Sequence, residues 1–189
     1  MAGVISFEER AVATLREKLG EAENARRKLI AFADGHCNAT AAIHDAVTNL
    51  MMCRDMDELS AVVTRDWPLL LRVDAVAMAL IVEGQAFRFD LSGIHPLEPI
   101  WVEKAAERAN PVEITGGKSG SPLFGAISKA LQSQAIIRIP AMSPGMPEGI
   151  LLLGQTDATP VSSSEGDQLL AFLGRSLSAM LARWVGNRN

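Results

Sequence analysis

Roughly the first fifty residues carry a stripe of mostly apolar positions with the spacing of a coiled coil. The stripe recurs at alternating steps of three and four residues, which are the a and d positions of a heptad repeat. Its members are Val12, Leu15, Leu19, Ala22, Leu29, Ala33, Thr40, Ile43, Val47 and Leu50. No proline interrupts them, so the pattern predicts one helix roughly 65 Å long, about twice the width of a small domain. We expect part of this helix to project and to pair with a second helix.

Charges beside the stripe predict how two such helices pair. Lys18 occupies a g position and Glu23 the following e position, and this opposite-sign pair favours a parallel, in-register dimer. Arg26 at an a position and His36 at a d position interrupt the stripe, and such polar residues typically specify register and limit a coiled coil to two strands. The alternative roles of His36 are a pH switch or a ligand.

The apolar face of the helix widens at residues 29–33. A wider face is expected where a helix leaves a coiled coil and begins to pack on a domain. We place this junction near Gly35, which divides the chain into a coiled-coil helix, residues 1–35, and a folded domain, residues 36–189.

A short helix is predicted next. Asp55 can accept a hydrogen bond at its N-terminus, and Glu58 stands at the third helical position. Pro68, after Trp67, is expected to end the helix. Its buried face is formed by Leu59, Val62 and Val63.

The apolar period then changes from that of a helix to that of a strand. Val73–Val82 is an apolar run, Glu83-Gly84 supplies turn residues, and Gln85–Leu91 alternates aromatic with charged side chains. This order predicts an antiparallel β-hairpin whose first strand is central in a sheet.

The remaining pattern predicts one helix, three strands and a final helix. Ser143-Pro144-Gly145 is a turn sequence between the last two strands, and Ser162 and Glu165 form a capping box for the final helix. The predicted elements are a helix at Ile100–Arg108, strands at Val112–Ile114, Ala135–Pro140 and Gly149–Gln155, and a helix carrying Leu169, Phe172, Leu173, Leu177, Met180, Leu181 and Trp184.

Composition fits one folded domain with an appendage. Of the 189 residues 48% are hydrophobic, which argues against disorder, and the formal net charge of −4 has the wrong sign for nucleic-acid binding. The basic run Arg26-Arg27-Lys28 is interpreted as a solvated helix face, the alternative being a phosphate-binding patch. Neither a signal peptide nor a membrane span is visible in the sequence. We therefore expect a cytoplasmic, bacterial-type protein that binds neither nucleic acid nor membranes.

No cluster of metal ligands or cysteine nucleophile stands out. Cys37 and His44 lie two helical turns apart, about 10 Å, which is too far for one zinc ion. Cys37 and Cys53 are separated by roughly 24 Å along a continuous helix, so reduced thiols are expected. Cys53 follows two methionines and is predicted to lie in the core. The candidate metal ligands are His36, Cys37, His44, Cys53 and His95.

The segment Gly116-Gly117-Lys118-Ser119 is similar to the end of a phosphate-binding loop. The full motif requires glycine where Val112 stands, and no strand–loop–helix pattern surrounds the segment. We interpret it as a flexible Gly/Ser loop whose backbone amides could meet an anion at the edge of a pocket.

The order of predicted elements resembles that of a GAF domain, the small-molecule-sensing relative of the PAS fold. The runs GVISFEERAVATLREKL, IHDAVTNLMMCRDMDEL, VDAVAMALI, EGILLLGQTD and FLGRSLSAMLARW, with the pair Phe124-Gly125, resemble the bacterial family called domain of unknown function 484. The resemblance implies an α+β fold, with an antiparallel sheet flanked by helices and a long N-terminal coiled-coil helix. It also implies a cytoplasmic dimer with a GAF-like pocket, and an N-terminus that is naturally short or truncated.

In a GAF-like arrangement one face of the sheet packs on the terminal helices, and the other can enclose a ligand beneath the middle helix and the Gly/Ser loop. Arg138 is the charged member of the predicted wall, because it stands among three isoleucines and requires an anionic partner if it is buried. Ordinary core packing is the alternative for the apolar members, and exposure at an edge is the alternative for Arg138. The predicted ligand-binding residues are Met78, Leu80, Phe87, Phe89, Trp101, Ser121, Phe124 and Arg138.

These observations predict a dimeric sensory or regulatory module whose ligand signals through the N-terminal helix. The alternative is a structural adaptor that binds a partner protein through its coiled coil, without a ligand. No nucleophile–base pair, cofactor motif or metal-spaced cluster is visible, so we expect neither an enzyme nor a bound cofactor or metal.

Overall fold

The computed structural model of the chain describes residues 7–116, 122–157 and 164–186. The chain comprises two compact units, Met1–Ala39 and Thr40–Asn189, and the single helix α1 (Phe7–Met52) contributes to both. The predicted long helix is therefore present. In the first unit, Leu19 of the apolar stripe is 61% exposed and Ala22 and Arg26 are also exposed.

The second unit is built on a six-stranded antiparallel sheet with the strand order β3-β2-β1-β6-β5-β4. All the predicted strands are present, and β1 is central as expected. β3 was missed because its sequence, GIHPL, has no apolar alternation. Its Pro96 is tolerated because β3 is an edge strand. The strands are β1 (Ala75–Val82), β2 (Gln85–Asp90), β3 (Gly93–Leu97), β4 (Val112–Gly116), β5 (Ser133–Ile139) and β6 (Glu148–Gln155).

Both predicted hairpin turns are confirmed. Between β1 and β2, Glu83 and Gly84 have φ angles of 52° and 77°, the two left-handed positions of a two-residue hairpin loop. Between β5 and β6, the N–H of Met146 donates to the carbonyl of Ser143 at 3.1 Å, and Gly145 has a φ of 83°. These positive angles favour glycine, as the turn sequences indicated.

The predicted short helix is longer than expected. Asp55 caps α2 (Met56–Ala61) by accepting from the N–H of Glu58 at 2.9 Å. A π-helical turn, η1 (Val62–Asp66), then leads into α3 (Trp67–Leu71). The prediction that Pro68 ends the helix is wrong, because the π-helical turn η1 carries the chain past Pro68 into α3.

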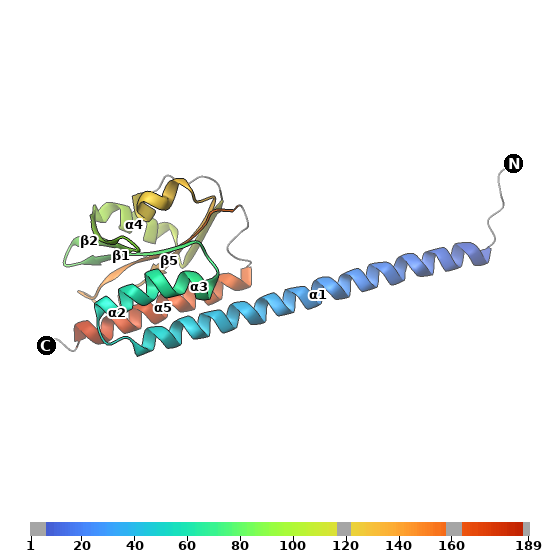
Figure 1. Cartoon of the computed structure of the whole chain (residues 1–189), viewed down its shortest axis with the longest axis horizontal. Coiled ribbons are helices and arrows are strands. Elements are labelled where there is room, and N and C mark those ends of the chain that lie inside the picture. Colours follow the sequence, from blue (N-terminus) through green and yellow to red (C-terminus); the bar gives the residue numbers. More distant parts are fainter. Residues whose placement is uncertain (1–6, 117–121, 158–163, 187–189) are drawn as a thin grey trace. The chain divides into compact units, whose positions relative to one another are not determined.

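Helices cover both faces of the sheet (Figure 1). The end of α1, the α2–α3 run and α5 (Ser164–Gly186) lie on one face, which we call the long-helix face. The predicted helix α4 (Pro99–Arg108) and the unpredicted 3-10 helix η2 (Pro122–Lys129) lie on the other, the short-helix face. Ser162 of the predicted capping box lies outside the described residues.

Each face has its own apolar core. On the long-helix face, Ile43, Ala46 and Leu50 of α1 are buried with Cys53, so this end of the apolar stripe packs on its own domain, and Cys53 lies in the core as predicted. The sheet contributes Val76, Met78, Leu80, Phe89, Ala135, Ile137, Ile139, Leu151 and Leu153 to this core. The sheet contributes Ala77, Ala79, Ala86, Ile136, Ile150 and Leu152 to the core of the short-helix face.

Candidate functional site

The sheet opens at the start of β1. The β1–β2 ladder begins at the pair Met78↔Phe89, whereas the β1–β6 ladder already begins at Ala75↔Gly154. The first three residues of β1 are therefore paired on one side only within the described part of the chain. A cavity of about 410 Å³ lies at this opening.

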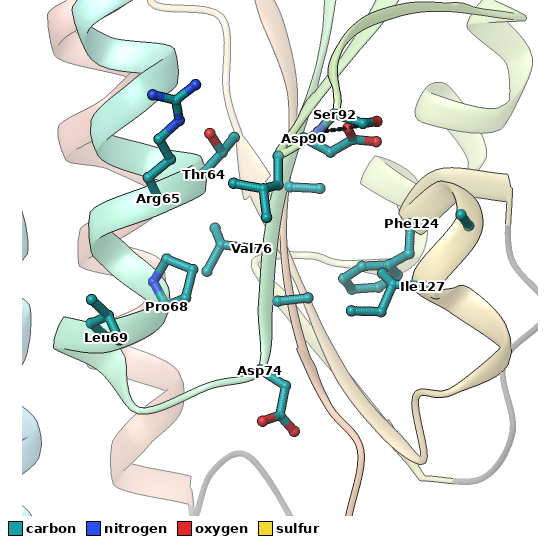
Figure 2. Close-up of a pocket in the computed structure, with 14 residues that line it drawn as sticks. Thr64, Arg65, Pro68, Leu69, Asp74, Val76, Asp90, Ser92, Phe124 and Ile127 are labelled. Carbon is teal, nitrogen blue, oxygen red and sulfur yellow. Dashed lines mark hydrogen bonds between the residues drawn. The ribbon is translucent and has the colours of Figure 1, made fainter.

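The cavity is walled from both faces of the sheet (Figure 2). Pro68 and Leu69 approach β1 from one side, and Phe124 and Ile127 of η2 approach from the other. The lining is mainly apolar, as is usual for small-molecule sites. The full lining consists of Thr64, Arg65, Pro68, Leu69, Asp74, Ala75, Val76, Ala77, Asp90, Leu91, Ser92, Phe124, Ala126 and Ile127.

Asp90 is the residue at which β2 turns away from β1. Its Oδ1 accepts from the N–H of Ser92 at 2.8 Å and from the Ser92 hydroxyl at 2.5 Å, a turn in which the aspartate side chain bonds the backbone two residues on. Its Oδ2 accepts from Nε of Arg88 at 2.7 Å. Burial by itself would raise the pKa of the Asp90 carboxyl, but the hydrogen bonds from Ser92 and the charge of Arg88 outweigh burial and hold this pKa below its usual value.

Arg88 also attaches η2 to the sheet. Its Nη1 donates to the carbonyl of Pro122 at 2.9 Å, and its side chain is 12% exposed. Gly125 of η2 has a φ of 61°, and a Cβ atom there would lie 2.7 Å from Nη2 of Arg88. The positive φ favours glycine at this position. The hydrogen bond from Arg88 to Pro122 thus ties η2, and Phe124 with it, to the sheet.

Ser92 and His95 form a polar pair at the same end of the cavity. The Ser92 hydroxyl lies 2.8 Å from Nε2 of His95, and Oδ1 of Asp90 lies 3.4 Å from that same nitrogen. A Ser–His–Asp triad instead places serine and aspartate on opposite nitrogens of the imidazole. The group is thus arranged as a turn-stabilising network rather than as an activated nucleophile.

Asp74 connects the other end of the cavity to the end of β6. Its carboxylate accepts from the N–H and from the hydroxyl of Thr156, both at 2.7 Å. These two hydrogen bonds lower the pKa of Asp74. Among the described residues, no three His, Cys, Asp or Glu side chains converge on a point where a metal ion could bind.

The structure does not bring the predicted ligand-binding residues to one wall. Met78, Leu80, Phe87 and Phe89 belong to the core of the long-helix face. Trp101 of α4 is 49% exposed and is not among the residues that line the cavity.

Of the remaining predicted residues, Phe124 alone lines the cavity, and Ser121 lies outside the described residues. Arg138 is partly buried, and its Nε atom is buried without a hydrogen-bond partner among the described residues. Arg138 is not part of the cavity lining.

Strand pairing explains this separation. Met78 pairs with Phe89 and Leu80 with Phe87, so these four side chains share one face. Arg138 and Ala79 both pair with Ile150, which places Arg138 on the opposite, short-helix face. The expectation that Arg138 and the β2 aromatics converge is therefore wrong.

Most residues that line the cavity were not singled out from the sequence. The sequence contains two local signals for the cavity. The first is that small and large side chains alternate along Ala75–Leu80, so that the alanines leave space on one face. The second is the sequence Asp90-Leu91-Ser92-Gly93, whose turn residues end β2 before it can pair with the start of β1.

Comparison with known proteins identifies both the family and the fold. The family described as "Protein of unknown function, DUF484" matches residues 1–186 of the chain. No curated protein matches the sequence. In the described residues no helix is long and apolar enough to cross a membrane.

Several solved structures share the fold at low identity. The GAF domain of A. aeolicus nlh2 in an inactive state has a TM-score of 0.57 and 11% identity, over 82% of this chain and 99% of that one. The GAF domain of an Acinetobacter phosphoenolpyruvate-protein phosphotransferase has a TM-score of 0.54 and 16% identity, over 78% and 96%. The chromophore-binding domain of Stigmatella aurantiaca bacteriophytochrome has a TM-score of 0.52 and 19% identity. That match covers 75% of this chain but only 59% of the phytochrome domain.

Proposed function

The chain belongs to the DUF484 family of proteins of unknown function, and we propose that it is a sensory or regulatory module whose GAF-like domain binds a small molecule. The observation that carries this proposal is the cavity of about 410 Å³ where β1 and β2 separate. Its volume falls in the range of ligand sites, and its walls are mainly apolar with polar groups at the ends. A small, largely apolar molecule is the expected ligand.

The walls of the cavity supply a route for a signal. Thr64 and Pro68 line the cavity from the η1–α3 run. The buried residues Val63 and Trp67 of the same run share a core with Ile43 and Leu50 at the end of α1. A ligand that shifts α3 would therefore change the packing of the last turns of α1, because a close-packed core transmits small displacements.

We further propose that two chains pair in parallel through the N-terminal part of α1. Leu19 and Ala22 of the apolar stripe are exposed in the single chain, and Lys18 and Glu23 are exposed beside them, where they can form the predicted pair between helices. A partner helix would remove these apolar side chains from water.

The dimer is tested by Leu19→Asp in the full chain. A charge in the coiled-coil seam should weaken the free energy of dimerisation by about 2 kcal/mol, which raises the dimer dissociation constant more than about tenfold. Analytical ultracentrifugation over a concentration series measures the change. Asn24→Asp, which adds the same charge at an exposed position off the stripe, is the matched control. Equal dissociation constants for the two variants would contradict a seam at Leu19.

The ligand is tested by native mass spectrometry of protein purified from its own host. We expect a retained small molecule that is lost in Ala75→Leu, because the larger side chain enters the cavity. Ala106→Leu is the control, since Ala106 packs on the core of the short-helix face but does not line the cavity. Absence of any retained molecule, or equal retention in both variants, would favour the adaptor function instead.

A further inference from the structure

The hairpin geometry determines which backbone groups of β1 face β2. A two-residue loop makes the flanking residues, Val82 and Gln85, a hydrogen-bonded pair, and such pairs recur at every second residue. The next such pairs are Leu80 with Phe87 and Met78 with Phe89. The pattern would continue with Val76 and Leu91.

That next pair does not form, because β2 ends at Asp90 and Leu91 belongs to the following turn. By this alternation the N–H and C=O of Val76 face away from β6 and toward the opening, and within the described ranges no backbone hydrogen bond joins Val76 to Leu91. Val76 itself lines the cavity and is 4% exposed. A mainly apolar cavity thus contains one backbone donor and one backbone acceptor, held rigidly in the strand.

These two groups have a defined complement. In an antiparallel ladder, a residue donates its N–H to the C=O of the residue opposite and accepts a hydrogen bond from the N–H of that residue. We propose that the cavity recognises an N-acylated α-amino-acid unit, whose N–H and carbonyl pair with the C=O and N–H of Val76. This inference rests on the proposed function and names the class of ligand for that site.

The walls match the substituents of such a unit. Paired residues place their side chains on the same face, so the side chain of the ligand would lie with Val76 toward Pro68 and Leu69 (Figure 2). The acyl group and the group after the carbonyl would lie beside Ala75 or Ala77, toward Phe124 and Ile127. Apolar groups at both positions suit these walls.

The opening also limits the length of the ligand. Met78 is already paired with Phe89 at one end, and at the other end the N–H of Asp74 donates to the carbonyl of Gly154. Among the described residues of β1, Val76 is the one whose N–H and C=O both face the opening. A single acylated residue is therefore favoured over an extended segment of a protein.

The premise is tested on the unliganded protein by amide hydrogen exchange measured by NMR. The Val76 amide should exchange faster than the amides of Ala75 and Ala77, which face β6. Protection of Val76 equal to that of its neighbours would overturn the inference.

Binding is tested by NMR titration with N-acetyl-leucine methylamide. The Val76 amide resonance should shift, and the analogue methylated on the leucine nitrogen should bind several-fold to about tenfold more weakly, because it lacks the donor. A capped tripeptide should bind no tighter than the single residue, and tighter binding would instead indicate a protein segment as the ligand. Equal binding of the methylated analogue would overturn the inference.

A protein variant tests the same donor. Val76→Pro removes an N–H that pairs with neither neighbouring strand, and it should weaken binding of N-acetyl-leucine methylamide by several-fold to about tenfold. Val76→Ala keeps the N–H and is the control. If the proline variant does not fold, the methylated analogue still decides. If a molecule retained from the host is lost in Ala75→Leu but the probe does not shift Val76, the amino-acid class is wrong while the proposed function stands.

Discussion

The two faces of the central strand β1 carry side chains of different size. In β1, Val76, Met78 and Leu80 enter the core of the long-helix face, whereas Ala77 and Ala79 enter that of the short-helix face. Large aliphatic residues fill the space beneath long helices. Alanines leave the opposite face open to short elements, which approach the strands closely.

The polar groups follow the same division. Arg88 and Asp90 lie on the short-helix face, with side chains 12% and 15% exposed. Arg88 holds η2 by donating to the carbonyl of Pro122, and Asp90 in turn accepts a hydrogen bond from Arg88. The long-helix face contains mainly apolar side chains. The comparison teaches that the long-helix face relies mainly on apolar packing, whereas the short-helix face also holds η2 beside the cavity through the polar contacts of Arg88.

The largest expected effect is on the long-helix face. Leu151 is fully buried there, and Leu151→Ala should lower the free energy of unfolding by about 2 to 5 kcal/mol through lost burial and the resulting cavity. Urea denaturation measures this change. Ile150→Val on the other face of the same strand is the control and should cost about 0.5 to 1.5 kcal/mol. A cost below that of the control would contradict the burial of Leu151 in the core of the long-helix face.

A smaller effect is expected at the attachment of η2. Gly125→Ala places a Cβ atom against Arg88 and puts alanine at a positive φ. The substitution should lower the free energy of unfolding by about 1 to 3 kcal/mol. It should also reduce ligand retention, because Phe124 shifts with η2. Gly145→Ala is the control, since Gly145 has a φ of 83° but open space around it. Equal destabilisation by both variants, measured by thermal unfolding, would show that contact with Arg88 is unimportant.

The Asp90 network predicts a dependence of stability on pH. The pKa of Asp90 is lower in the folded state than the ordinary value of 3.8. The contribution of ionised Asp90 to the free energy of unfolding is therefore fully present above pH 3.8, and it is lost as the pH falls through the folded-state pKa. Asp90→Asn should therefore be less stable than the parent at neutral pH and should lose less stability on acidification. Unfolding free energies from pH 7 to pH 2 test this. Parallel pH curves would contradict it.

The smallest effects are expected at predicted residues that the structure places outside the cavity lining. Arg138→Ala and Trp101→Ala should leave ligand retention within about twofold of the parent. Phe124→Ala, which removes part of the wall, should reduce retention markedly. A large loss in Arg138→Ala would place the ligand beneath α4 instead of at the start of β1.

The sequence predicted the elements better than it predicted the site. The apolar spacing of α1, the alternation in β1 and the turn residues Glu83-Gly84 are local signals, and the structure has a helix, a strand and a hairpin turn at these places. The end of the short helix was misplaced, because a π-helical turn allowed the chain to continue through Pro68. Which aromatic residues face the ligand depends on strand register, which no single segment encodes.

The sequence by itself determined a long apolar-striped helix, a central strand with large and small faces, and a GAF-like order of elements. These features follow from side-chain period and turn chemistry within short stretches. Only the tertiary structure decided that Phe87 and Phe89 are core, that Arg88 attaches η2, and that β2 leaves β1 before Val76. The physical reason is that a cavity forms where segments far apart in the chain fail to pair, and pairing is a property of the assembled sheet.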